Sequence, residues 1–156
     1  MADALEVRMY TMCLVQDEDK VLLLNRPDKL GSPGYLGAGG KVDFPESLTE
    51  GAIREVWEET GLRVKNLVYK GLDECVDRKR NVRGMVFNYI TSTFEGELLE
   101  NPPEGELVWV PIGEALKLPM QHWFKTRFPL FFEEGTFEIY QLWDGETLIS
   151  RSVKKL

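Results

Sequence analysis

The segment from Ser47 to Gly61 constrains the fold most, because it carries both a start and a stop signal for a helix. Ser47 and Glu50 have the spacing of a capping box, in which each side chain hydrogen-bonds to the backbone N–H of the other residue. Gly61 stands where a glycine commonly ends a helix in the left-handed conformation. The sequence therefore predicts a helix over residues 48–60.

Three glutamates share one side of this predicted helix. At about 100° per residue, Leu48 and Val56 lie on an apolar stripe that faces a core. Glu55, Glu58 and Glu59 lie on a neighbouring face, and Glu59 reaches the edge of the stripe. Partly buried carboxylates need either raised pKa values or bound cations, and Mg²⁺ is the usual hard cation beside phosphates. A solvated acidic face is the alternative that the helix alone leaves open.

Composition excludes several classes of protein. The chain has 156 residues, 43% of them hydrophobic and 29% charged, which predicts one globular domain over residues 1–156. A net charge of −7 disfavours binding to nucleic acid polymers, although a small phosphorylated ligand stays compatible with it. No long apolar run or secretory signal is present, so we expect no membrane span and a cytoplasmic location. Cys13 and Cys75 are too few for a disulfide scaffold.

The rest of the chain predicts a mixed α/β domain with many strands and two principal helices. Apolar and β-branched runs predict strands over residues 7–15, 21–25, 64–76, 82–94 and 107–110. One helical turn is expected over 113–116 and a second helix over 123–133. Asp144-Gly145, between runs 137–143 and 147–153, predicts a β-hairpin. Residues 26–34 are expected to form a loop, and a glycine-rich passage follows at 37–40.

The helix lies within a longer motif. The fixed residues of that motif are Gly40, Glu46, Arg54, Glu55, Glu58, Glu59 and Gly61, with Val56 and Leu62 at its two aliphatic positions. This run is identified as a complete Nudix box. The resemblance implies the α/β Nudix fold, a mixed β-sheet sandwiched between α-helices. It also implies hydrolysis of a nucleoside diphosphate linked to another group, with Mg²⁺ as cofactor or Mn²⁺ in its place.

Roles for the box residues follow from the same resemblance. Glu55, Glu58 and Glu59 would bind the metal together with the backbone carbonyl of Gly39. Glu55 or a neighbouring carboxylate would act as the base, and the resemblance leaves open which one.

The resemblance also implies roles for three further residues of the site. Arg54 and Glu46 would hold the metal-binding carboxylates in place. A distant glutamate ahead of Trp109 would add one more ligand, and Glu104 is favoured over Glu106 by its spacing to the Trp.

Beyond the box, the chain resembles the MutT-like branch that removes oxidised purine nucleoside triphosphates. This likeness includes Tyr10-Thr11, the apolar block at 21–23, the run 128–130 and the final segment 144–149. The candidate substrate-binding residues are Thr11, Arg26, Lys41, Leu36, Trp123 and Phe124. Arg26 and Lys41 are candidates for holding phosphate, and Trp123 and Phe124 for stacking on a base. Leu36 occupies the position of a base-reading Asn in this branch, and residues 121–124 lack the aspartates that relatives carry there.

The leading hypothesis is a Mg²⁺-dependent pyrophosphohydrolase that converts (d)NTPs, oxidised purines such as 8-oxo-dGTP included, to a nucleoside monophosphate and pyrophosphate. A second hypothesis is hydrolysis of another nucleotide derivative: a nucleotide sugar, ADP-ribose or a dinucleotide. A third is a sensor that binds nucleotide without cleaving it, although all the box carboxylates are present. The expected partner is a small-molecule nucleotide, bound by a monomer or homodimer.

Overall fold

The computed structural model describes residues 4–156. The strands are β1 (Glu6–Asp17), β2 (Lys20–Arg26), β3 (Gly34–Leu36), β4 (Ala38–Lys41), β5 (Leu62–Lys65), β6 (Val68–Asp77), β7 (Val82–Thr91), β8 (Thr93–Gly96), β9 (Glu106–Pro111), β10 (Phe137–Asp144) and β11 (Thr147–Lys155). The helices are α1 (Leu48–Thr60), α2 (Ile112–Ala115) and α3 (His122–Arg127), with 3₁₀ turns at Asp28–Leu30 and Phe128–Phe132. No helix among the described residues is long and apolar enough to cross a membrane.

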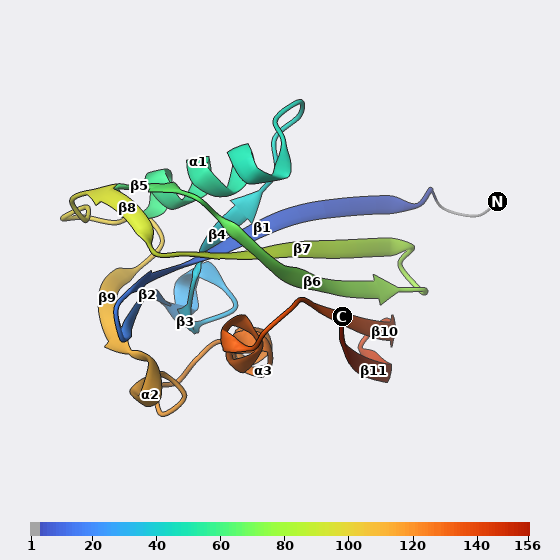
Figure 1. Cartoon of the computed structure of the whole chain (residues 1–156). Helices are drawn as coiled ribbons and strands as arrows, with labels where there is room; N and C mark the ends of the chain where they lie inside the picture. Colours follow the sequence, from blue (N-terminus) through green and yellow to red (C-terminus); the bar gives the residue numbers. More distant parts are fainter. Residues whose placement is uncertain (1–3) are drawn as a thin grey trace.

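Within residues 4–156, nine of the strands form one mixed sheet (Figure 1). Its main order is β11-β10-β6-β7-β1-β2-β3, with β4 also pairing with β1 and β9 with β2. The pairs β1–β7 and β6–β10 are parallel, whereas the other pairs in this sheet are antiparallel. Strands β5 and β8 form a separate two-stranded sheet near the C-terminal end of α1.

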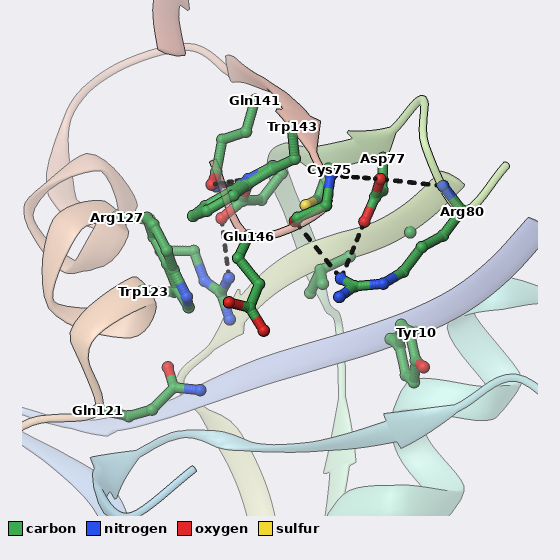
Figure 2. A pocket seen from close by; sticks show the side chains of 14 residues that line it. Tyr10, Cys75, Asp77, Arg80, Gln121, Trp123, Arg127, Gln141, Trp143 and Glu146 are labelled. Atoms are coloured by element: carbon green, nitrogen blue, oxygen red, sulfur yellow. Dashed lines mark hydrogen bonds and ion pairs between the residues drawn. The ribbon is translucent and has the colours of Figure 1, made fainter. Parts of the chain in front are cut away.

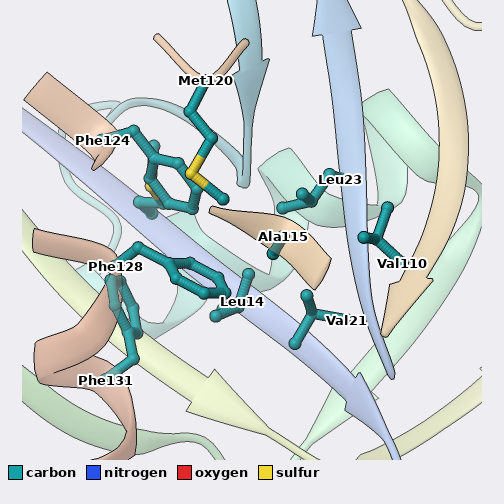
Figure 3. Close-up of a cluster of buried hydrophobic side chains, with 10 residues drawn as sticks. Leu14, Val21, Leu23, Val110, Ala115, Met120, Phe124, Phe128 and Phe131 are labelled. Carbon is teal, nitrogen blue, oxygen red and sulfur yellow. The ribbon is translucent and has the colours of Figure 1, made fainter. Parts of the chain in front are cut away.

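Helices cover both faces of the large sheet (Figure 1). Helix α1 packs on one face through a cluster that includes Ala52 and Val56. On the other face, α3 and the 3₁₀ turn after it bury three aromatic rings, those of Phe124, Phe128 and Phe131, against Leu14 and neighbouring strands (Figure 3). The predicted fold, a mixed sheet between helices, is therefore confirmed.

Two of the predicted strands are each interrupted. Residues 64–76 and 82–94 were expected to be continuous, but each divides into two strands that join different sheets. Asn66, between β5 and β6, has a positive φ of 53°. Thr91 lies beside the second interruption, where its hydroxyl donates to the Lys65 carbonyl and accepts from the Thr93 N–H at 3.1 Å. These side chain–backbone bonds replace the strand ladder at both breaks.

The predicted helix over 123–133 is also wrong in extent. Helix α3 ends at Arg127, and a 3₁₀ turn follows, with Pro129 in its first turn. Proline has no N–H to continue an α-helix, so the tighter turn takes over. Only α1 is a long helix among the described residues.

The glycine-rich passage has more regular structure than expected. Residues 38–41 form β4, which pairs antiparallel with β1, Gly39 opposite Met12 and Gly40 opposite Thr11. The expected loop over 26–34 contains the first 3₁₀ turn and leads into β3. The predicted hairpin at the end of the chain is confirmed as β10–β11.

Candidate active site

Helix α1 begins and ends where its sequence signals predict. The Ser47 hydroxyl accepts a hydrogen bond from the Glu50 N–H at 3.1 Å. Gly61 adopts a φ of 86°, and its N–H donates to the Trp57 carbonyl at 2.9 Å. Both ends are fixed by local contacts. The positions of Glu55, Glu58 and Glu59 around the helix axis are therefore defined.

Glu59 is the most buried of the three glutamates, with 9% of its surface exposed. Its Oε2 accepts a hydrogen bond from the Gly39 N–H at 3.0 Å. Burial raises the pKa of Glu59 to about 8; the charges of Glu55 and Glu104 also raise it, against the opposing effects of Gly39 and Arg26. A metal cation bound beside Glu59 would lower its pKa and so favour the ionised carboxylate.

Arg54 holds the other carboxylates of the box. Its Nη1 donates to Glu55 Oε1 at 3.0 Å and to Glu58 Oε2 at 3.1 Å. Its Nε and Nη2 donate to the two carboxylate oxygens of Glu46 at 3.1 and 2.8 Å, and Nη2 also reaches the Lys41 carbonyl at 2.9 Å. One guanidinium thus joins α1 to the loop before it and to β4, as expected of a positioning residue.

Two glycines bring β4 close to its neighbours. A Cβ on Gly40 would collide with the Glu55 carboxyl group, and a Cβ on Gly39 would collide with the Thr11 carbonyl of β1. Glycine at both positions therefore lets the β4 backbone lie directly against α1 and β1. At Gly39 the obstacle is backbone, so glycine is needed there, whereas at Gly40 a larger residue would displace the Glu55 carboxyl group.

The structure distinguishes Glu104 from Glu106. Glu104 lines a cavity together with Glu59 and accepts a 2.6 Å charged hydrogen bond from Arg26 Nη1. Glu106 lies in β9 opposite Asn25 of β2 and lines a different depression. Of the two, Glu104 is the one that shares a cavity with Glu59.

These residues fit a hard divalent cation. Among the described residues, no three acidic, His or Cys side chains form a ready-made metal site, and Arg54 neutralises Glu55 and Glu58. Glu59, however, is a buried carboxylate whose ionised form is disfavoured. Oxygen donors of this kind are the ligands that Mg²⁺ prefers. We therefore propose Glu55, Glu58, Glu59, the Gly39 carbonyl and Glu104 as the residues that hold it.

The raised pKa of Glu59 predicts how stability depends on pH without metal. The folded state keeps the proton up to about pH 8, whereas the unfolded chain releases it near the ordinary value of 4.5. The folded state binds more protons in that window, so the free energy of unfolding falls as pH rises from about 4.5 to about 8. Thermal unfolding in EDTA across this range measures the fall.

Glu59→Gln is the matched variant, because its amide oxygen can still accept from Gly39. We expect its melting temperature to decline less with pH than that of the wild type. Added Mg²⁺ should stabilise the wild type more at pH 8 than at pH 6, since binding requires the ionised carboxylate. Identical pH profiles for the two proteins would contradict the assignment.

One cavity opens beside this acidic face, and a second adjoins it. One, of about 500 Å³, is lined by Glu59, Glu104, Arg26, Thr11 and Leu36 among others. The second, of about 610 Å³, lies between β6, β7, α3 and the end of the β10–β11 hairpin (Figure 2). They share four lining residues, namely Tyr10, Val86, Gln121 and Arg127. The two cavities therefore adjoin and lead away from the glutamates.

The predicted substrate-binding residues lie in four different places. Thr11, Arg26 and Leu36 line the smaller cavity, and Trp123 lines the larger one. Lys41 is exposed at the end of β4, outside the described lining of both cavities. Phe124 has 0% of its surface exposed and packs in the core. The expectation that Phe124 stacks on a base is therefore wrong, because no ligand reaches its ring.

Sequence reasoning also missed residues of the larger cavity. Arg127 and Asp73 form an ion pair at 2.9 Å, each almost fully buried. Gln141 donates to Asp73 at 3.3 Å and accepts from the Trp143 indole N–H at 3.2 Å. Asp73, a charged residue within a segment predicted to be a strand, was a signal available for this cluster.

The comparisons with known proteins agree with this geometry. The model of the NUDIX domain family matches residues 7–131. An uncharacterized Nudix hydrolase, YvcI of Bacillus subtilis, is 31% identical over 117 residues, which are 73% of this chain and 72% of that protein. The oxidized purine nucleoside triphosphate hydrolase of Mus musculus is 42% identical over 60 residues, 38% of each chain.

A solved structure agrees over nearly the whole chain. The mutator MutT protein from Bacillus halodurans is 32% identical, with a TM-score of 0.81 and coverage of 94% of this chain and 97% of that one. This match covers more of the chain than the family model, which spans residues 7–131. Together with the glutamates of α1, these similarities establish that the chain belongs to the Nudix hydrolase family and is of the MutT-like type.

Proposed function

We propose that this Nudix hydrolase cleaves nucleoside triphosphates, oxidised purine nucleotides included, to a nucleoside monophosphate and pyrophosphate with Mg²⁺. The observation that carries the proposal is the pair of adjoining cavities that starts at Glu59 and Glu104 and ends between Trp123 and Trp143. Their size and order suit a triphosphate next to the glutamates and a nucleoside beyond it. The mouse relative, named for oxidised purine nucleoside triphosphates, supports the same choice.

Each group of the site has a separate role in the proposed hydrolysis. When bound, the divalent cation neutralises phosphate oxygens and lowers the pKa of a water. Arg54 keeps Glu55 and Glu58 in place, while Gly39 orients Glu59 through its N–H. One of these carboxylates accepts the proton as the water oxygen bonds to phosphorus. The phosphoanhydride P–O bond breaks, and pyrophosphate leaves.

Product analysis tests this proposal. Metal-free protein is supplied with Mg²⁺ and a panel of dNTPs, 8-oxo-dGTP, ADP-ribose, a nucleotide sugar and a dinucleoside tetraphosphate, and products are separated by anion-exchange chromatography. We expect a monophosphate and pyrophosphate from the triphosphates, and no product in EDTA. Release of inorganic phosphate, or fast cleavage of only the other compounds, would contradict the proposal.

A further inference from the structure

The larger cavity is completed by a part of the chain that lies outside the family match. That match ends at residue 131, whereas Gln141, Trp143, Gly145 and Glu146 come from the β10–β11 hairpin and line the cavity (Figure 2). Residues beyond the region matched by the family model are candidates for choosing between substrates. The polar groups that the hairpin contributes indicate which kind of ligand the cavity favours.

An aromatic corner forms one side of the cavity. The rings of Trp123 and Trp143 lie 5.8 Å apart at an angle of 85°. The Trp143 indole N–H donates to Gln141 Oε1 at 3.2 Å, which fixes the orientation of the ring. A fixed, half-buried indole next to a cavity of this size gives a flat base a surface on which to stack.

Arg127 supplies hydrogen-bond donors to the floor of the cavity. Asp73 accepts from its Nη1 at 2.9 Å, while Nη2 faces the Met12 sulfur at 3.2 Å. Its Nε, buried, has no hydrogen-bond partner among the described residues. The side chain is 5% exposed and lines both cavities. Asp73 holds the guanidinium, and its remaining N–H groups suit a ligand oxygen or ring nitrogen.

Glu146 supplies a hydrogen-bond acceptor to the same cavity. The other two lining carboxylates are engaged: Asp73 by Arg127, and Asp77 by the N–H groups of Arg80 and Gly145. Within residues 4–156 no hydrogen bond or ion pair is recorded for the Glu146 carboxylate. Its side chain enters the cavity on the side of Arg127 (Figure 2). A free carboxylate here accepts hydrogen bonds and donates none.

The turn that carries Glu146 is fixed in place. Asp77 at the end of β6 accepts from the Gly145 N–H at 3.0 Å. Arg80 donates to the Gly145 carbonyl at 3.4 Å, and Arg78 donates to Asp144 at 3.4 Å. These contacts tie the hairpin turn to the turn between β6 and β7, so Glu146 is held at the cavity rather than on a free loop.

We propose that Glu146 and Trp143 make the C-terminal hairpin the base-selecting element of this enzyme, with a guanine-type base as the ligand. This inference rests on the proposed function. Guanine offers two adjacent N–H donors to one carboxylate and, on its other edge, acceptors for an arginine. Adenine has an unprotonated ring nitrogen in place of the first donor, and its lone pair would face the Glu146 carboxylate. An acceptor at Glu146 and a donor at Arg127 in one cavity therefore favour guanine over adenine.

Glu146→Gln tests the carboxylate, since it removes the charge without changing the size of the side chain. Binding of dGMP and dAMP is followed by tryptophan fluorescence in EDTA, so the readout needs neither metal nor turnover. We expect wild-type protein to prefer dGMP by about 10-fold or more, and the variant to lose most of that preference. In turnover of dGTP the variant should raise KM with little change in kcat.

Two further variants complete the experiment. Glu138→Gln, on the same hairpin but outside the described cavity lining, should leave both affinities unchanged. Trp143→Leu should weaken dGMP and dAMP binding alike, because stacking does not distinguish the bases. An unchanged dGMP preference in Glu146→Gln, or no preference in the wild type, overturns the inference.

The two proposals can fail separately. Cleavage of triphosphates without base preference refutes only the selecting role of the hairpin. Glu146-dependent dGMP binding without triphosphate cleavage refutes only the proposed reaction, and leaves the base site in place.

Discussion

Glu58→Gln is expected to lower kcat by about 10²–10⁴-fold on whichever nucleotide the enzyme cleaves. The amide keeps the size of the side chain but removes the negative charge that a cation or a transferred proton requires. The Glu58 side chain is 49% exposed, and its 3.1 Å ion pair with Arg54 joins residues one helical turn apart. Such exposed pairs contribute about 0.3–0.5 kcal/mol to stability, so steady-state kinetics should change while the urea midpoint does not.

Glu50→Gln is the matched control for this prediction. Glu50 is an exposed glutamate on the first turn of the same helix, and it takes part in the cap through its backbone N–H, which the substitution retains. Its activity should stay near that of the wild type. If Glu58→Gln kept wild-type kcat at saturating Mg²⁺, the assignment of Glu58 to the metal site would be refuted.

Phe124→Ala is expected to destabilise the fold by about 3–5 kcal/mol, the usual cost of removing a buried aromatic ring. The ring is fully buried and lies 5.7 Å from that of Phe128 and 6.3 Å from that of Phe131. Its loss leaves a cavity between α3 and the sheet, which the surrounding side chains fill only in part. Denaturation in urea should therefore show a much lower midpoint with an unchanged slope.

Two comparison variants separate a core role from a ligand role. Phe124→Leu should recover most of the stability, because it returns most of the lost volume. Trp123→Ala, at the neighbouring cavity-lining position, should cost less stability but weaken nucleotide binding. Wild-type stability of Phe124→Ala would contradict the placement of this ring in the core.

The catalytic helix was predictable because its determinants are local. Ser47 and Gly61 fix its ends, and the periodicity of the helix alone places Glu55, Glu58 and Glu59 on one side. Arg54 was placed by the family motif, and its contacts with Glu46 and Glu55 in the structure are those expected of its role. The relative positions of residues within one helical turn can be predicted without knowing how the strands pair.

The larger cavity was not predictable because its walls meet only through long-range pairing. Arg127 reaches Asp73 across 54 positions, and Gln141 does so across 68. The Gln141 contact depends on β6 pairing in parallel with β10, and the Arg127 contact depends on how α3 packs on β6; no local pattern indicates either. The wrong placement of Phe124 beside Trp123 has a similar cause: a helix of six residues is too short for its periodicity to show which aromatic ring faces the sheet.

The order of the strands makes the enzyme separable into two parts that evolution or protein engineering can vary independently. The β10–β11 hairpin joins the sheet along β6, whereas β4 and α1 join it at β1, with β7 in between. Exchange of the hairpin for that of a relative would thus replace the cavity wall that includes Trp143 and Glu146 and leave in place the hydrogen bonds among Arg54, Glu55 and Glu58. Under the proposed role of the hairpin, grafting this one terminal segment would change the nucleotide preference while keeping the same hydrolytic centre.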